Sequence, residues 1–368
     1  MSEAYVRGNK AYDEDEAAKQ QIKELNKRIY DIQTANDHDS SLAQIYWTTR
    51  QWSYDALDQF YLRIKVKFDK YYPESQTAPI GLEIVKRELG NGVFEESDGA
   101  VVFRAEKYGL HTRVFINNQG LPTYETKDVG LAILKDRDYH FDKSLIITGN
   151  EQEQYMAVVY KAIEQFAPEL VEKTTHLTHG MVRLAGNVKM SSRAGNIIKA
   201  TDILDAAAEA SKEVSGKDDE RVVLAAVKYS FLKQRIGGDI IFDPKDSVSI
   251  LGNSGPYLQY AHARARSILK KASAASAENI SDLMDSERPL ALKLSRYSQV
   301  VALAAAELSP HQVCTYLYDL AQVFNRFYEQ NRVIGDEREE TRLRLVETYA
   351  GRLKDGLELL GIEAPERL

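Results

Sequence analysis

Apolar residues repeat along the chain with two different periods, one helical and one extended. Between Ile22 and Ile32 they recur at spacings of three and four, which predicts an amphipathic helix over residues 15–33 with one face toward the core. Residues 99–105 and 112–118 alternate apolar and polar side chains, as half-buried β-strands do. A mixed α and β architecture is therefore expected for the first part of the chain.

A short apolar run, then a turn, then a helical period occupies residues 143–166. Leu145–Thr148 is typical of a strand buried in a parallel sheet, and Gly149 and Asn150 form the turn. This is half of an α/β nucleotide fold, whose ligands sit at the carboxyl ends of the strands, so Gly149 to Gln152 are placed to touch one. Neither Gly-x-Gly-x-x-Gly nor a P-loop motif occurs, which excludes those two versions of the fold.

From residue 202 onward the pattern predicts helices throughout. Ser309, Pro310 and Gln312 have the spacing of a serine cap, a first-turn proline and a capping-box glutamine. Glycines, aspartates and a proline cluster in residues 240–255, where we expect the boundary to a helical bundle. The predicted fold class is therefore α/β followed by all-α.

Composition and charge narrow the classes of function. The 368 residues are 43% apolar, as in a soluble protein of two or three domains. Because the formal charge is −7, the protein could bind nucleic acid only through local positively charged patches and not through its overall charge. The single cysteine, Cys314, excludes an internal disulfide and a cysteine-rich metal site and fits a cytoplasmic protein. A polar start and the lack of a ~20-residue apolar run predict no signal peptide and no membrane span.

The segment "GNVKMSSRAGN", residues 186–196, combines cations and hydroxyls in a glycine-punctuated loop. Lys189 offers a compact ammonium, Arg193 a planar fork, and Ser191 and Ser192 offer hydroxyl donors. Such a loop can stabilise the negative charge of a leaving pyrophosphate. The alternative is a plain surface turn, because so short a motif occurs by chance.

The loop resembles the KMSKS loop of class I aminoacyl-tRNA synthetases, in the form found in arginyl-tRNA synthetases. Other segments resemble the same family in the same order: "LPTYETKDVG" its amino-acid-binding helix, "THLTHGMVRL" its adenine-binding strand, "GNSGPYLQYAHARARSIL" the start of its anticodon-binding domain, and "LLGIEAPERL" its chain end. The resemblance covers nearly all of the sequence. It implies the second half of a Rossmann-like catalytic domain followed by a helical-bundle anticodon-binding domain.

The resemblance implies an arginine-binding set of Tyr124, Asp128 and Gln152, with Glu151 as a rival to the last. Tyr124 and Asp128 are four residues apart, so they share one face of a helix. A carboxylate there suits a guanidinium, which prefers bidentate carboxylate contacts. Without the resemblance, an exposed aspartate beside a half-buried tyrosine would be the favoured interpretation.

For ATP, the resemblance implies Gly149 at the strand end and His179, Gly180, Met181 and Val182 around the adenine, where backbone groups read the base edge. His176 is a weaker candidate. Mg²⁺ is expected to accompany ATP as part of the substrate, and no bound structural metal is expected. Lys189, Ser191, Ser192 and Arg193 would hold the phosphates.

For transfer RNA, arginines and aromatic residues near one another can grip phosphates and stack on splayed bases. The alternative is that arginines such as Arg264 and Arg266 are solvated surface charges. The candidates are Tyr257, Gln259, Tyr260, His262, Arg264, Arg266, Asn325, Arg326, Tyr328 and Arg332.

The sequence departs from the family pattern at two points. Ser192 stands where the KMSKS motif has its second lysine, a replacement common among arginyl enzymes. No His-x-Gly-His motif occurs in the 368 residues. We therefore expect the carboxy-terminal part of such an enzyme, poorly active alone and with an exposed sheet edge. The expected parts are a partial catalytic domain (1–185), the loop with stem-contact helices (186–250) and the anticodon-binding domain (251–368).

The implied reaction joins L-arginine to its transfer RNA (tRNA-Arg) with ATP, through arginyl-adenylate. The partners are L-arginine, ATP and tRNA-Arg, and the intact enzyme is expected to be a monomer. The alternative from the same sequence is a non-catalytic, synthetase-derived module that binds tRNA, which the missing His-x-Gly-His favours.

Overall fold

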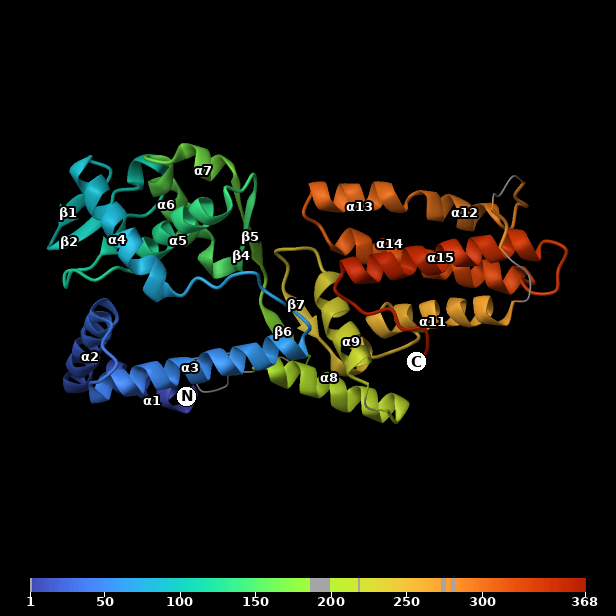
Figure 1. Cartoon of the computed structure of the whole chain (residues 1–368), viewed down its shortest axis with the longest axis horizontal. Helices are drawn as coiled ribbons and strands as arrows, with labels where there is room; N and C mark the ends of the chain where they lie inside the picture. Colours follow the sequence, from blue (N-terminus) through green and yellow to red (C-terminus); the bar gives the residue numbers. More distant parts are fainter. Residues whose placement is uncertain (1, 186–198, 218, 273–275, 279–281) are drawn as a thin grey trace. The chain divides into compact units, whose positions relative to one another are not determined.

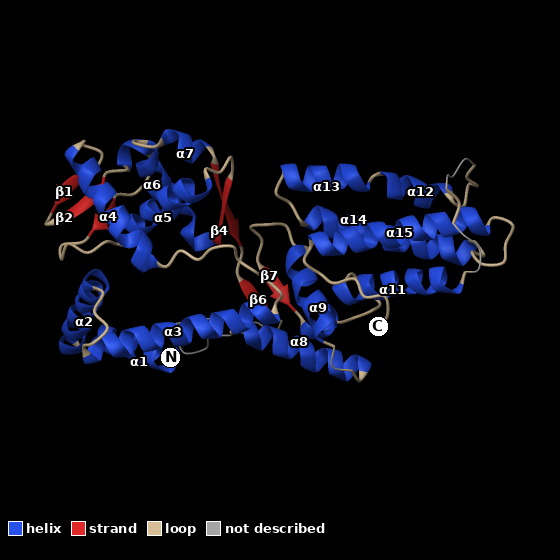
Figure 2. Ribbon diagram, viewed as in Figure 1, coloured by secondary structure: helices blue, strands red, loops and turns tan. Residues whose placement is uncertain are grey.

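The computed structural model describes residues 2–185, 199–217, 219–272, 276–278 and 282–368. The chain divides into two compact units, with Gly180 in the first and Met181 in the second. Figure 1 labels most of the helices and strands, and Figure 2 shows the helices and the short strands by colour. Each unit has its own core and is described by itself.

The first unit is an α/β unit with a helical start. Its helices are α1 (Ser2–Glu14), α2 (Glu16–Ala35), α3 (Ser41–Arg63), α4 (Glu74–Gly90), α5 (Tyr124–Tyr139), α6 (Glu153–Glu164) and α7 (Pro168–Glu172), with single 3-10 turns at Glu106–Tyr108 and Asn150–Gln152. Its strands are β1 (Glu95–Ser97), β2 (Ala100–Phe103), β3 (Arg113–Ile116), β4 (Ser144–Gly149) and β5 (Thr174–His179). The predicted strands at 99–105, 112–118 and 145–148 are confirmed as β2, β3 and β4.

Two sheets lie in this unit. Strands β1, β2 and β3 form an antiparallel sheet, and β4 pairs in parallel with β5. Among the described strands β4 has a partner on one side only, and the Ile147 side chain is 63% exposed. Phe94, Phe103 and Phe115 pack together in the core of the unit.

Helices α4 and α5 pack with unusually close backbones. A Cβ on Gly81 would lie 1.8 Å from the carbonyl oxygen of Thr126, and one on Gly130 would lie 2.1 Å from that of Thr77. Real Cβ atoms do not approach so closely, so each glycine permits a contact that no other residue allows. This contact fixes α5 against α4 and so fixes the residues that α5 presents.

The helix expected at 15–33 is present as α2, but its stripe is only partly buried. Ile32 is buried, whereas Leu25 is 42% exposed. The expected core-facing stripe is therefore only partly formed. The reason is that α2 contacts few elements of its unit.

The second unit is mainly helical, with one two-stranded parallel sheet of β6 (Val182–Leu184) and β7 (Ile240–Phe242). Its helices are α8 (Ala200–Ser215), α9 (Glu220–Leu232), α10 (Pro244–Ser247), α11 (Gly255–Lys271), α12 (Arg288–Ser295), α13 (Tyr297–Ala306), α14 (His311–Gln330) and α15 (Glu339–Leu359). The expectation of helices alone after residue 202 missed β7, which is three residues long and pairs with a strand formed far earlier in the chain.

The bundle core is built on α11, α14 and α15, which lie side by side (Figure 1). The rings of Phe324 and Tyr349 stack with centroids 3.8 Å apart. The predicted capping box at Ser309 is not formed. Helix α14 begins at His311, and the Gln312 amide donates to the Glu307 carboxylate instead.

A buried ion network ties the start of α12 to α15. Glu287, which is fully buried, accepts from the Arg338 guanidinium at 2.6 Å and from Nε of Arg342 at 3.0 Å. Burial alone would raise the pKa of Glu287, but the hydrogen bonds from the two arginines outweigh it and lower the pKa to about 2. Glu287 is therefore ionised at every physiological pH.

Replacing Glu287 with Gln should lower the free energy of unfolding by about 3–5 kcal/mol at pH 7, because two arginines lose their buried counter-charge. Because the pKa of Glu287 is lower in the folded protein, this stabilisation is complete at pH values above the ordinary pKa of glutamate. It is lost as the pH falls toward 2. Denaturant titrations of both proteins across this range measure the difference. Glu358→Gln, in an exposed pair with Lys354 on the same helix, should change stability by less than about 1 kcal/mol. An equal decrease in the free energy of unfolding for the two variants would contradict the conclusion that the buried ion network of Glu287 stabilises the fold.

Candidate functional site

A cavity of about 420 Å³ lies between α5, β4 and α6 in the first unit. Asp128 and Leu131 line it from α5, Thr148 from β4, and Gln152 and Tyr155 from the turn and helix after β4. The structure thus brings together two of the three residues predicted to hold L-arginine. Glu151, the rival to Gln152, does not line this cavity.

Asp128 is the acidic group of the cavity and is only partly exposed. The Tyr155 hydroxyl donates to its Oδ2. Burial raises the pKa of Asp128, and the Tyr155 hydrogen bond opposes that rise. Among the described residues no lysine or arginine forms an ion pair with Asp128. A half-buried carboxylate with a neutral donor and no ion-pair partner is suited to receive a cationic ligand.

Tyr155 is a residue that the sequence-based prediction missed. It follows Gln152 by three residues and so falls on the same side of the chain as it enters α6. Burial and the nearby Asp128 carboxylate raise its pKa, so it remains a hydroxyl donor. The i, i+3 spacing from Gln152 was the one signal available in the sequence.

Tyr124 lies away from the cavity. Its side chain is 65% exposed, and its ring centroid is 4.5 Å from the Lys127 ammonium. Lys127 also pairs with Glu74 at 2.6 Å and lies 5.6 Å from the ring of Tyr30. Tyr124 and Asp128 are both on α5, but the structure does not place Tyr124 on this cavity, because a cation–π contact draws its ring toward Lys127.

The carboxyl ends of β4 and β5 meet at Gly149 and His179, which are register partners. A Cβ on Gly149 would approach the Glu151 carboxylate to 2.4 Å, so a larger residue would displace that side chain. His176 Nε2 lies 2.8 Å from the Thr148 hydroxyl, and burial lowers the pKa of His176. Gly149 and His179 thus stand where an α/β sheet places its ligand.

Several of the other residues predicted to bind the nucleotide already have hydrogen-bond partners within the protein. His179 Nδ1 lies 2.9 Å from the Gly180 carbonyl oxygen. The Met181 amide donates to Asp239 at 2.9 Å, and the Met181 carbonyl accepts from Ile240 at 2.8 Å, so its backbone groups already have partners. Val182 pairs with Ile240 in the sheet. Lys189, Ser191, Ser192 and Arg193 lie outside the described residues.

In the second unit, α11 and α14 share a face of aromatic and polar residues. The Asn325 amide donates to the Tyr257 hydroxyl at 3.0 Å. The Arg264 guanidinium carbon lies 4.7 Å from the Tyr328 ring centroid. Tyr260 on the same helix is 47% exposed. The structure therefore brings four of the predicted tRNA contacts into two neighbouring pairs, with Tyr260 beside them.

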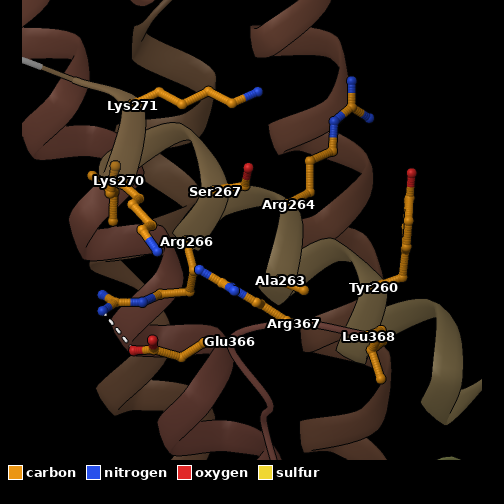
Figure 3. Close-up of a pocket in the computed structure, with 11 residues that line it drawn as sticks. Tyr260, Ala263, Arg264, Arg266, Ser267, Lys270, Lys271, Glu366, Arg367 and Leu368 are labelled. Carbon is orange, nitrogen blue, oxygen red and sulfur yellow. Dashed lines mark hydrogen bonds and ion pairs between the residues drawn. The ribbon is translucent and has the colours of Figure 1, made fainter.

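Beside this face is an open cavity of about 1030 Å³, drawn in Figure 3. It is lined by Tyr260 and Arg264 and by cations that the sequence-based prediction missed, Lys270, Lys271 and Arg367. Arg266 also lines it and pairs with Glu366 at 2.8 Å. The spacing from Tyr260 to Arg264 and to Lys271 is helical, which was a usable signal for one of the lysines. Arg326 and Arg332 are exposed, and Arg332 donates to the Ile334 carbonyl.

Gln259 and His262 are corrected from tRNA contacts to structural residues. Gln259 is fully buried and His262 is 2% exposed. The Gln259 amide donates to the Glu363 carbonyl at 2.8 Å, and His262 Nδ1 donates to the Pro365 carbonyl at 2.9 Å. Both side chains point toward the segment after α15, so neither can reach RNA in this structure.

Two family models match the chain. Residues 1–242 match the class I tRNA synthetase (R) catalytic domain, and residues 258–368 match the DALR anticodon binding domain. The chain belongs to the arginyl-tRNA synthetase family. The predicted fold class, a Rossmann-like α/β part followed by a helical anticodon-binding domain, is confirmed.

Individual relatives agree with this assignment. The arginine–tRNA ligase of Porphyromonas gingivalis is 34% identical over 354 residues, covering 90% of this chain and 59% of the relative. That of Flavobacterium psychrophilum is 32% identical over 377 residues, covering 96% and 62%. The chain therefore spans about three-fifths of the length of the curated relatives that it matches.

Solved structures of the family have the same fold. The arginyl-tRNA synthetase of Thermus thermophilus superposes with a TM-score of 0.79 at 25% identity, over all of this chain and 69% of the other. That of Plasmodium falciparum gives 0.78 at 20% identity, over 96% and 62%, which shows the fold alone.

None of the described helices is both long enough and apolar enough to cross a membrane.

Replacing Tyr155 with Phe should raise the pKa of Asp128 further, because the ionised carboxylate loses its donor. A cationic ligand that needs the ionised carboxylate should then be released at a higher pH from the Tyr155→Phe variant than from the unchanged protein. Carboxyl-carbon NMR titration measures the pKa directly. Tyr160→Phe is the control, because Tyr160 lines the same cavity, whereas the hydrogen bond to Asp128 comes from Tyr155. Equal shifts from both variants would assign the effect to the cavity and not to the Tyr155 bond.

Proposed function

We propose that the chain supplies the arginine-selecting and tRNA-binding parts of an arginine–tRNA ligase. In that reaction the carboxylate of L-arginine attacks the α-phosphorus of ATP, which releases pyrophosphate and leaves arginyl-adenylate. The terminal 2′-hydroxyl of tRNA-Arg then takes the arginyl group and releases AMP. The observation that carries the proposal is the Asp128 carboxylate, held in a cavity with Gln152 in a chain of this family.

Asp128 selects L-arginine by charge and by shape. A guanidinium can place two parallel N–H donors on one carboxylate, whereas an ammonium offers a point charge. Burial makes an unpaired Asp128 unfavourable, so a bound cation relieves a cost that is already present in the free protein. Gln152 would contact the same ligand from the opposite wall, and Tyr155 would orient the carboxylate.

ATP would bind at the carboxyl ends of β4 and β5, next to this cavity. Gly149 and His179 are neighbours there, and their position supports the assignment of both to ATP. Gly180, Met181 and Val182 would complete the adenine site. Lys189, Ser191, Ser192 and Arg193 would stabilise the phosphates electrostatically, and Mg²⁺ would enter with ATP.

Transfer RNA would bind across α11 and α14. Arg264 stacks on Tyr328, and Tyr257 bonds to Asn325, so the face offers ordered rings and cations to bases and phosphates. The cavity beside it adds Lys270, Lys271 and Arg367. Local charge of this kind resolves the conflict with a formal charge of −7.

We further propose three functional parts: residues 1–185 as catalytic, 186–250 as the phosphate loop with stem-contact helices, and 251–368 as anticodon-binding. The protein would act in the cytoplasm, as a monomer when joined to the remainder of the catalytic centre. The 368 residues contain no His-x-Gly-His, so on their own they lack the histidines that stabilise the α-phosphate transition state. This observation also favours a second candidate, a module that binds tRNA without catalysis.

The chain alone should show only background ATP–pyrophosphate exchange with L-arginine and tRNA-Arg. Joined to a polypeptide that carries the His-x-Gly-His half of an arginyl-tRNA synthetase, it should exchange well above background. Exchange by the 368 residues alone would overturn the division of the active site. If the joined protein binds tRNA-Arg but does not exchange, the binding module becomes the better description.

In the joined protein, Asp128→Asn should reduce kcat/KM for L-arginine by about 30- to 1000-fold, equivalent to about 2–4 kcal/mol, because a buried cation loses its counter-charge. Pyrophosphate exchange at varied L-arginine measures it. Asp136→Asn, on the same helix but not lining the cavity, is the matched control and should leave the value unchanged. A normal kcat/KM for Asp128→Asn would remove Asp128 from the site.

A further inference from the structure

The segment after α15 lies along α11 and is held there by buried side chains. Gln259, which is fully buried, donates through its amide to the Arg221 carbonyl at 3.2 Å and to the Glu363 carbonyl at 2.8 Å. One side chain thus joins α9, α11 and the final segment. The two carbonyls use both of its N–H donors, which fixes the orientation of the amide.

His262, one helical turn later on α11, holds the next part of the segment. Its Nδ1 lies 2.9 Å from the Pro365 carbonyl oxygen. A carbonyl only accepts, so Nδ1 carries the proton and donates it. Burial lowers the pKa of His262, and the surrounding charges of Arg266, Lys354 and Glu366 partly offset one another, so the ring stays neutral.

Further contacts complete the attachment. The Lys228 ammonium donates to the Gly361 carbonyl at 2.7 Å, and Gly361 adopts a left-handed φ of 66° that turns the chain after α15. Ile362 is buried in the bundle core. Arg266 pairs with Glu366, as the dashed line in Figure 3 shows.

These contacts determine where Arg367 lies. Arg367 directly follows Glu366 and lines the same cavity as Tyr260 and Arg264 (Figure 3). We propose that Gln259 and His262 are positioning residues for RNA binding: they hold residues 361–366 against α11 so that Arg367 adds a phosphate-binding cation to the Tyr260–Arg264 face. This inference rests on the proposed binding of tRNA.

The physical reason is pre-organisation. If the segment came free, the buried donors of Gln259 and His262 would lose their acceptors, and Arg367 would move on an unattached end. Binding RNA would then require that end to be ordered first, which weakens affinity. Both residues therefore act on RNA without touching it.

The test uses the 368-residue chain and fluorescently labelled tRNA-Arg, with anisotropy titrations over a series of KCl concentrations. His262→Leu, which removes the donor, should weaken binding about five- to tenfold at low salt. It should also reduce the slope of log affinity against log salt by about one, the signature of one lost phosphate contact. His262→Asn places an amide donor near the position of Nδ1 and should keep most of the affinity.

A mutant cycle separates positioning from general damage to the fold. Arg367→Ala changes only an exposed side chain, whereas a chain ending at Ala364 removes Arg367 together with the Pro365 carbonyl that accepts from His262. Both should give the same loss and the same slope change as His262→Leu. Combined with the shortened chain, His262→Leu should have no further effect. Thermal unfolding of each variant checks that the bundle is intact.

The outcomes are distinct. Unaltered tRNA binding by His262→Leu or by Arg367→Ala would overturn the inference and leave the proposed function standing. Additive losses in the double variant, or a loss without a change of salt slope, would overturn it as well. No binding of tRNA-Arg by the unchanged chain would overturn the proposed tRNA binding and, with it, this inference.

Discussion

The close contact between α4 and α5 is the constraint on which the candidate active site depends. Gly81 and Gly130 let the two backbones touch at Thr126 and Thr77, and any side chain at either glycine would separate them. Because α5 cannot rotate in this contact, neighbouring residues on it have fixed and different surroundings. Asp128 lines the cavity toward β4, whereas Lys127 is held by Glu74 and Tyr30 on the other side.

The fully buried Glu287 and the half-buried Asp128 show how the surroundings of a carboxylate distinguish a structural role from a candidate ligand-binding role. Glu287 has two arginines, and its pKa is lowered to about 2, so it is fully satisfied within the fold. Asp128 accepts from a tyrosine hydroxyl and forms no ion pair with a described lysine or arginine, and its pKa is raised. A partly buried charged group without an ion-pair partner in the protein is a candidate for ligand binding, because a ligand of opposite charge can supply that partner. The second case is therefore the informative one for function.

The sequence was sufficient for the features that depend on local pattern. The period around Leu145–Thr148 located β4, and the family resemblance placed Asp128 and Gln152, which the structure brings into one cavity. Features that depend on distant partners were not predictable. Strand β7 exists because it pairs with β6, nearly sixty residues earlier, and the Tyr124 ring turns toward a lysine whose position depends on α2 and α4.

The helical periodicity of α11 already divides its polar and aromatic residues between two opposite sides of the helix. With about 100° of rotation per residue, Tyr257, Tyr260 and Arg264 fall within an arc of about 60°. By the same rotation, Gln259, His262 and Arg266 fall within another arc of about 60° on the opposite side.

The first arc meets α14 and solvent, and the second meets the segment after α15. Polar residues close together in sequence therefore have two different tasks, one on each side of a single helix. Helical periodicity alone could not predict which side of α11 would be covered, because the segment that covers it lies about a hundred residues farther along the chain. That dependence also makes the Tyr260–Arg264 face sensitive to residues that it does not contain.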